Sequence, residues 1–112
     1  MVAKRYIPDS GDLVWINFDP TKGHEQNNTR PAIVLSPKKY SQKTSLAVVC
    51  PVTSQGKGYP FEVLLETKRI SGVILSDQIR TIDWKARPVK FVCRSPKGTL
   101  EQVRAKIQKL IF

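Results

Sequence analysis

The sequence predicts a mainly β domain: a strongly bent antiparallel barrel of roughly five to seven short strands, with small helical content and a C-terminal helix. Two observations carry this prediction. Short runs of β-branched and aromatic residues are separated by polar and Gly- or Pro-containing turns, and only the last segment repeats its apolar residues at helical spacing. The chain has 112 residues, so residues 1–112 are expected to form a single domain of SH3-like or OB-like size.

Strands are expected where apolar residues run together or alternate with polar ones. These segments are residues 12–18, 32–35, 46–50, 61–65, 72–75, 80–87 and 89–93. The run at 32–35 is apolar throughout, which is typical of a central buried strand. Pro31 can only begin that strand, because proline has no N–H for the ladder. The strict alternation at 80–87 predicts one charged, solvated face.

Helical segments are expected at two places. Ser36 and Pro37 have the pattern of a cap and a first helical residue, which predicts a short helix or turn at 36–43. Near the C-terminus, Thr99 and Gln102 form a capping-box pattern. The apolar residues beyond it recur at helical spacing: Leu100, Val103, Ile107, Leu110 and Ile111. We therefore expect an amphipathic helix of about three turns that covers an open end of the barrel.

The charge balance narrows the classes of partner. The chain carries 19 Lys and Arg against 9 Asp and Glu, a net charge of +10, and such a domain attracts nucleic acid or an acidic protein. No stretch approaches the roughly 18 apolar residues of a membrane span, and residues 1–10 lack a signal-peptide pattern, so we expect a cytoplasmic protein without membrane contact. Cys50 and Cys93 lie in apolar runs, which predicts reduced, buried thiols.

Several kinds of catalytic site are disfavoured by the residues. The chain has one histidine, His24, and its two cysteines are far apart in sequence, so we expect no metal centre. The Gly56-Lys57-Gly58 segment lacks the strand-loop-helix context and the Ser or Thr of a phosphate-binding loop. No other cofactor is expected.

Two loops at the ends of neighbouring apolar runs carry the candidate catalytic residues. These are Glu25, Gln26 and Arg30 before the run at 32–35, and Thr53 and Ser54 after the run at 46–50. If the two runs pair as an antiparallel hairpin, the start of the first lies beside the end of the second. Arg30 is then expected close to Thr53.

Arg30 suits a phosphoryl group, because its planar fork makes bidentate hydrogen bonds to phosphate oxygens and stabilises charge that develops on phosphorus. Metal-free cleavage of RNA needs such a cation, a base for the 2′-hydroxyl proton and an acid for the leaving 5′-oxygen. Glu25 or His24 could serve as the base. A structural explanation fits the same residues, since Arg30 could pair with Glu25 and Thr53 could cap a turn. The residues alone leave both explanations open.

A second polar island, Asp77-Gln78, lies between two expected strands. Amide and carboxylate side chains read base edges, although a turn with a buried Asp would show the same pattern. Three aromatic residues adjoin the polar loops and could either stack on unpaired bases or belong to the core: Phe18, Tyr59 and Phe61. Trp15 and Trp84 lie inside strand patterns, so we expect them to be structural.

Taken together, these segments resemble the MazF/PemK (Kid) toxins of bacterial toxin–antitoxin modules over nearly the whole chain. The matching segments are Gly11-Asp12-Leu13-Val14-Trp15, Phe18-Asp19-Pro20 with Gly23, Glu25-Gln26, Arg30-Pro31-Ala32-Ile33-Val34-Leu35-Ser36, Pro51-Val52-Thr53-Ser54 and Ser76-Asp77-Gln78-Ile79-Arg80-Thr81-Ile82-Asp83. Two segments look especially close to the enterobacterial MazF branch: Phe18-Asp19-Pro20-Thr21-Lys22-Gly23 and Lys57-Gly58-Tyr59-Pro60-Phe61-Glu62-Val63.

The resemblance implies a sequence-specific, ribosome-independent endoribonuclease that cuts single-stranded mRNA without a metal. Cleavage would leave a 2′,3′-cyclic phosphate and a 5′-hydroxyl. Because the mRNA is cut, translation would stop. The resemblance also implies an SH3-like barrel with a C-terminal helix, and a homodimer whose interface shapes the RNA groove. An acidic MazE-like antitoxin would lie across that groove. The protein would contact DNA only as part of the antitoxin complex. The charge of +10 suits both partners.

The resemblance also assigns residues position by position. Arg30 and Thr53 match the family's catalytic arginine and threonine, and Glu25 matches a glutamate that supports activity. The residues that we assign to RNA binding are Phe18, Gln26, Ser54, Lys57, Asp77, Gln78 and Arg80. Some relatives carry an arginine that helps catalysis shortly before the Asp-Gln pair, but residues 73–76 here contain none. His24 occupies a position that varies in the family, so the identity of the base stays open.

Two other functions are compatible with such a barrel. CcdB-like toxins share the fold, poison DNA gyrase and cleave nothing. A non-catalytic RNA-binding barrel would bind RNA with strong salt dependence and leave it intact. Arg30 and Thr53 favour the nuclease. The chain also ends in Lys109-Leu110-Ile111-Phe112 rather than in the Trp-Gly-Ile tail that resembles those of gyrase poisons.

Overall fold

The computed structural model describes residues 5–18 and 29–112, and these residues form a mainly β fold as predicted. Its strands are β1 (Asp12–Asn17), β2 (Thr29–Val34), β3 (Leu46–Thr53), β4 (Glu62–Glu66), β5 (Ser71–Leu75), β6 (Arg80–Asp83) and β7 (Val89–Arg94). Its helices are α1 (Lys38–Thr44) and α2 (Thr99–Ile111). The pairings between these strands are antiparallel.

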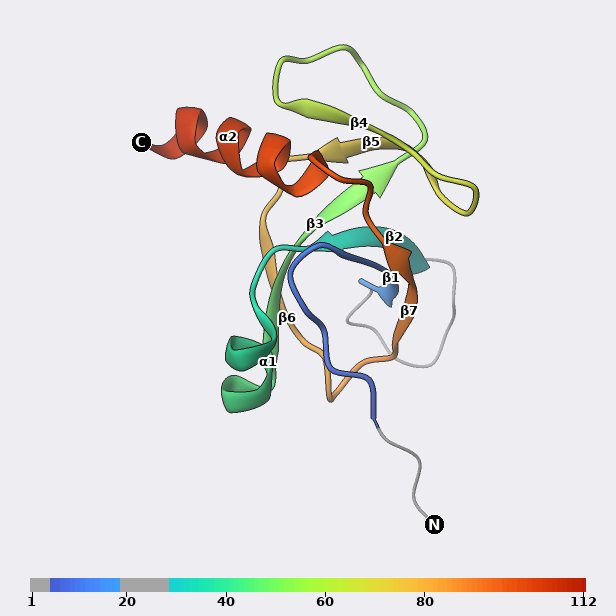
Figure 1. Ribbon diagram of the computed structural model, residues 1–112, viewed down its shortest axis with the longest axis vertical. Helices are drawn as coiled ribbons and strands as arrows, with labels where there is room; N and C mark the ends of the chain where they lie inside the picture. Colours follow the sequence, from blue (N-terminus) through green and yellow to red (C-terminus); the bar gives the residue numbers. More distant parts are fainter. Residues whose placement is uncertain (1–4, 19–28) are drawn as a thin grey trace.

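The strands form a curled sheet in the order β4-β5-β3-β2-β1-β7, with β6 also paired to β3 (Figure 1). Strand β3 is the longest described strand and is shared: Leu46–Val49 pair with β6, whereas Val52 and Thr53 pair with β5. One long strand therefore joins two parts of the sheet. Helix α2 lies across β4 and β5, and α1 lies at the opposite end of the molecule beside β6.

The core consists of two clusters, one on each face of β1, because successive strand residues point to opposite faces. Leu13 belongs to the first cluster, together with Val103 of α2, and both are fully buried. Val14 and Ile16 belong to the second cluster, which extends to the buried Trp84. Burial of each large aliphatic side chain stabilises the fold by about 1.5–3 kcal/mol. We expected α2 to cover an open end of the barrel; in the structure it covers the curled sheet, with Val103 fully buried in the first core cluster.

Strand boundaries differ from the prediction by more than one residue in three places. β2 begins at Thr29, so Pro31 lies inside it; the ladder to β3 reaches only to Ala32, and therefore no bond to β3 needs a donor from proline. β3 runs three residues further than residue 50, to Thr53, because its end gains β5 as a partner. β6 ends at Asp83, whose carboxylate accepts the N–H groups of residues 85 and 86 at 3.0 and 3.1 Å and so forms a turn.

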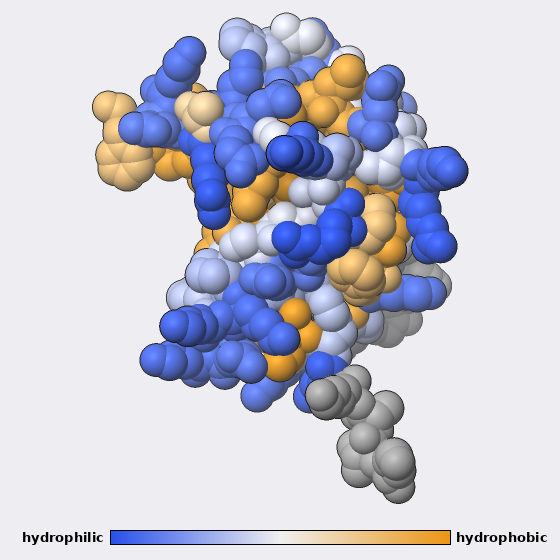
Figure 2. All heavy atoms as spheres, viewed as in Figure 1, coloured by the Kyte–Doolittle hydropathy of each residue, from blue (hydrophilic) through white to orange (hydrophobic). Residues whose placement is uncertain are grey.

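The helix caps also differ from the prediction. Ser36 does not cap α1; its hydroxyl oxygen accepts the Val48 N–H at 2.9 Å, and Pro37 occupies the N-cap position. The capping box at Thr99 is not formed, because the N-cap of α2 is Gly98 with a φ of 90° and no side-chain cap bond is made. The last turn of α2 is exposed, and Figure 2 shows apolar atoms gathered at this end of the helix.

The remaining expectations concern cysteine, tryptophan and membrane segments. Cys50 is fully buried, but Cys93 is only half-buried, and both are free thiols. Burial is the main cause that raises the pKa of the Cys50 thiol to about 12, and the charge of Asp77 is the second cause.

Trp84 is structural as expected, since it is buried and donates from its indole N–H to the Ser41 carbonyl at 3.1 Å. Within the described part of the chain, no helix is long and apolar enough to cross a membrane.

Candidate active site

Strand register brings Arg30 and Thr53 together. β2 and β3 pair antiparallel with Ala32 opposite Pro51, so two further residues along each strand bring Arg30 level with Thr53. The predicted hairpin pairing is therefore confirmed. Both residues line one pocket of about 530 Å³, where Arg30 is exposed and Thr53 is half-buried.

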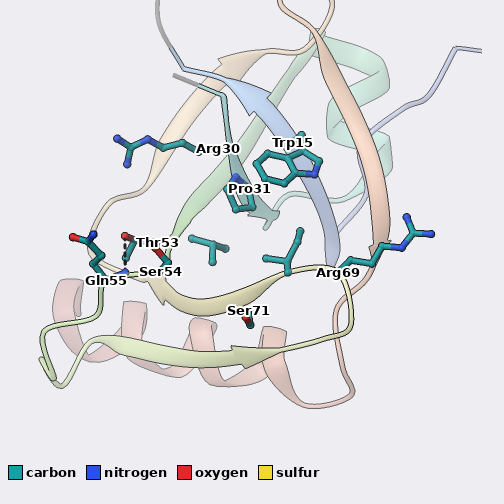
Figure 3. Close-up of a pocket in the computed structure, with 10 residues that line it drawn as sticks. Trp15, Arg30, Pro31, Thr53, Ser54, Gln55, Arg69 and Ser71 are labelled. Atoms are coloured by element: carbon teal, nitrogen blue, oxygen red, sulfur yellow. Dashed lines mark hydrogen bonds between the residues drawn. The ribbon is translucent and has the colours of Figure 1, made fainter. Parts of the chain in front are cut away.

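The pocket is formed by β1, the start of β2, the end of β3 and the turn before β5. Its lining residues are Trp15, Arg30, Pro31, Val52, Thr53, Ser54, Gln55, Arg69, Ile70 and Ser71. Figure 3 shows Arg30 on the same side of the pocket as Thr53, while Arg69 extends outward at the other end and the Trp15 ring stands between the two arginines. Two cations thus lie on either side of an aromatic ring. This arrangement is suited to binding more than one repeating unit of a polyanion.

The Thr53 hydroxyl is fixed by its own backbone. Its oxygen accepts the Gln55 N–H at 3.2 Å, drawn as a dashed line in Figure 3, so Thr53 does organise a turn. Accepting this bond leaves the hydroxyl proton available as a donor toward the pocket. The structural explanation for Thr53 therefore holds and is compatible with a chemical role. The other structural explanation, an Arg30–Glu25 ion pair, involves a residue outside the described ranges.

Phe18 does not present a free ring to a base; of the two alternatives, stacking or the core, the structure has the core. The ring is only 7% exposed, because strand alternation places it on the same face as Val14 and Ile16 in the second core cluster. The Arg80 guanidinium lies over the ring at 4.8 Å from its centroid. Phe18 thus supports the cation rather than a nucleotide.

Asp77 and Gln78 lie in the turn between β5 and β6, and both are exposed. The Gln78 N–H donates to the Leu75 carbonyl at 3.1 Å, which shapes this turn. Neither residue lines the pocket of Arg30 and Thr53, and Arg80 does not line it either. Of the expected RNA-binding residues, Ser54 therefore lines the pocket, whereas Asp77 and Gln78 lie in this turn and Arg80 begins β6. Gln26 and Glu25 lie outside the described residues.

Lys57 lies in an exposed loop that is held by the Glu62 carboxylate. Glu62 accepts the backbone N–H groups of Lys57 at 2.9 Å and Gly58 at 3.0 Å. In the same loop, the Tyr59 and Phe61 rings stack with centroids 5.2 Å apart. The bond from the Lys57 N–H is the main cause that lowers the pKa of the Glu62 carboxyl. Glu62 therefore fixes the backbone that carries Lys57 and Tyr59.

This loop should respond to acid in a defined way. Because the folded pKa of Glu62 is lowered, its bonds stabilise the loop above the ordinary pKa of 4.5 and are lost as pH falls through the lower folded value. The amide proton shifts of Lys57 and Gly58, followed by NMR, should titrate together with a midpoint below 4.5. Glu62→Gln should remove that titration. A midpoint at or above 4.5, or an unchanged titration in the variant, would contradict this role for Glu62.

Sequence reasoning missed Trp15 and Arg69 as pocket residues. Trp15 was expected to be structural, but it is 38% exposed and lines the pocket. Alternation did offer a signal, since Trp15 has the opposite parity to Val14 and Ile16, which are fully buried. Nothing in the sequence pattern indicates that Arg69, in the turn after β4, would reach the same pocket.

Comparison with known proteins agrees with this geometry. The family model described as PemK-like, MazF-like toxin of type II toxin-antitoxin system matches residues 9–111. Endoribonuclease toxin MazF of Escherichia coli K12 is 48% identical over 98% of this chain and 99% of its own length. Endoribonuclease PemK of Escherichia coli is 35% identical over 99% of this chain and 87% of its own length.

Solved structures show the same likeness. The crystal structure of MazF from Deinococcus radiodurans matches with a TM-score of 0.85 and 48% identity, covering 96% of this chain and 98% of that one. A MazE–MazF complex from the same organism matches with a TM-score of 0.84 and 44% identity, covering 96% of this chain and 97% of that one. The match over residues 9–111, with Arg30 and Thr53 in one pocket, shows that this chain belongs to the PemK-like, MazF-like toxins of type II toxin–antitoxin systems.

Proposed function

We propose that this protein is the toxin of a type II toxin–antitoxin pair and that it cleaves single-stranded mRNA in the cytoplasm without a metal ion. The observation that carries the proposal is the shared pocket of Arg30 and Thr53. It places a guanidinium fork and a hydroxyl donor at one end of a cavity whose volume falls in the range of ligand sites, roughly 300–1,000 Å³. The curated relatives named endoribonuclease support the same reaction.

In the proposed reaction, the 2′-hydroxyl of the substrate attacks the neighbouring phosphorus as a base removes its proton. The bond from phosphorus to the 5′-oxygen breaks, the leaving oxygen takes up a proton, and the products are a 2′,3′-cyclic phosphate and a 5′-hydroxyl. Arg30 binds the non-bridging oxygens and stabilises the charge that grows on them. The Thr53 hydroxyl donates a hydrogen bond to one of the same oxygens, keeps its proton and so orients the phosphate.

Partners follow from the same proposal. A relative from Deinococcus radiodurans was solved as a MazE–MazF complex, and we expect an acidic antitoxin to bind this chain and block its pocket. The net charge of +10 favours both this peptide and RNA. We also expect a homodimer whose interface contributes to the RNA groove.

A cleavage assay tests the function directly. Purified protein is incubated with a long mixed-sequence RNA in excess EDTA, and the cut sites and their ends are mapped. We expect cuts at one short sequence, with cyclic phosphate and 5′-hydroxyl ends. RNA that is bound but intact at enzyme excess would contradict the nuclease and favour a non-catalytic RNA-binding barrel. Intact, unbound RNA together with inhibited supercoiling would favour a gyrase poison.

A further inference from the structure

The position of Trp15 in the sheet does not explain why its side chain is exposed. β1 is an interior strand, between β2 and β7, so the exposure of Trp15 is not that of an edge strand. Its chain neighbours Val14 and Ile16 are 0% exposed, whereas Trp15 is 38% exposed. An indole left open on a strongly basic domain offers a flat surface on which a nucleic-acid base can stack.

Cations surround this indole on two sides. Trp15 is paired with Pro31 on β2 and with Lys90 on β7, so the side chains of all three share one face of the sheet. Lys90 is exposed, and Arg69 lines the end of the pocket away from Arg30 (Figure 3). A base on Trp15 would therefore have a guanidinium within the same pocket for its phosphate.

Arg69 is presented by a turn that hydrogen bonds hold in shape. The Thr67 hydroxyl oxygen accepts the N–H groups of Arg69 at 3.1 Å and Ile70 at 2.8 Å, and the Thr67 N–H donates to the Ile70 carbonyl at 2.9 Å. Ile70 is only 5% exposed and anchors the turn in the core. Arg69 forms no ion pair with any residue in ranges 5–18 and 29–112. The turn that carries Arg69 is thus held in shape, and the exposed guanidinium is available to a ligand.

We propose that Trp15 and Arg69 form a second nucleotide subsite, which binds the nucleotide next to the scissile phosphate. Its base stacks on the Trp15 indole and its phosphate pairs with Arg69, while Arg30 and Thr53 hold the reacting phosphate. The inference rests on the proposed nuclease function and deepens it. The subsite contributes affinity and register rather than chemistry, so its loss should raise KM and leave kcat within about twofold.

Binding to a non-cleavable RNA isolates the subsite from the reaction. The probe is a short RNA that contains the mapped cut site with a 2′-O-methyl group there, measured against the full chain. Trp15→Ala and Arg69→Ala should each weaken binding by about tenfold, the range of one stacked base or one phosphate contact. Trp15→Phe should restore most of the loss. Lys68→Ala is the matched control, because Lys68 is an exposed cation in the same turn that does not line the pocket.

An abasic scan identifies the stacked nucleotide without relying on a variant's folding. In the wild-type protein, removal of one base beside the cut site should weaken binding by about tenfold. In Trp15→Ala the same removal should cost nothing, because the stack is already absent. Equal abasic losses in both proteins, or an Arg69→Ala effect no larger than that of Lys68→Ala, would overturn the subsite.

Two other outcomes separate this proposal from its neighbours. If Trp15→Ala weakens self-association and leaves RNA affinity unchanged, the indole belongs to an interface between copies, and the subsite is overturned. If the protein cuts RNA but both variants bind the probe as the wild type does, only the subsite fails. If the wild type leaves unmodified RNA intact, the proposed nuclease function itself fails.

Discussion

Arg30→Ala should lower the rate of RNA cleavage at least about 100-fold and leave the fold unchanged. The variant loses a hydrogen-bond donor that stabilises the charge of the transition state. A single donor of this kind contributes roughly 100- to 1,000-fold to the rate. Arg30 is exposed at the start of β2, so its truncation removes no core contact. Single-turnover cleavage of a defined RNA measures the rate, and circular dichroism with thermal unfolding checks the fold.

Two further variants sharpen the test of Arg30. Arg30→Lys keeps the charge but loses the planar fork, so it should recover only part of the rate. Arg104→Ala removes the same side chain from an exposed position on α2 that does not line the pocket, and it should cleave like the wild type. Cleavage by Arg30→Ala at a rate close to that of Arg104→Ala would remove Arg30 from the proposed mechanism.

Gly72→Ala should be among the most destabilising single changes in the sheet, lowering the free energy of unfolding by about 3 kcal/mol. A Cβ at Gly72 would lie 2.3 Å from the Thr53 carbonyl oxygen, and the φ of +148° is one that other residues rarely adopt. The contact is with backbone, so no side chain can rotate to relieve it. β5 must then move away from the end of β3, and cleavage activity should fall together with stability.

The matched control for this prediction is Gly58→Ala. Gly58 also has a positive φ, +82°, but nothing lies within 4 Å of its added Cβ. This variant should cost only the conformational penalty, about 1 kcal/mol. In thermal unfolding, Gly72→Ala should therefore melt roughly 10–15 °C below the wild type, well below Gly58→Ala. Equal melting temperatures for the two variants would show that the sheet accommodates a side chain at Gly72.

The pairing of Arg30 with Thr53 was predictable because it depends on two apolar runs that are close in sequence. Their antiparallel pairing fixes which residues are level, and the structure has this register. The position of Trp15 was not predictable in the same way. Alternation shows that Trp15 lies opposite to Val14, but whether that face is covered depends on how β5 folds back against β3, which is a long-range contact.

Local signals also failed where backbone geometry overrode side-chain preference. The capping-box pattern at Thr99 predicted a helix start that Gly98 makes instead, because glycine reaches a φ of 90° without strain. Likewise, Pro51 marked the end of an apolar run in sequence but lies within β3. In both cases the segment was predicted correctly and only its boundary differed. The end of β3 is set by a partner strand, β5, that the local sequence does not specify, whereas the start of α2 is set by Gly98 itself.

The antiparallel pairing of β2 with β3 has an evolutionary consequence. The proposed reactive pair is set by strand register, whereas Lys57 lies in the separate loop that Glu62 holds and Asp77 lies in a turn between two strands. Residues 57–61 lie outside the pocket of Arg30 and Thr53, so we expect substitutions there to alter which nucleotides bind while the register of the reactive pair is kept. We therefore expect target sequences to diversify through this loop faster than through the strands that hold the reactive pair.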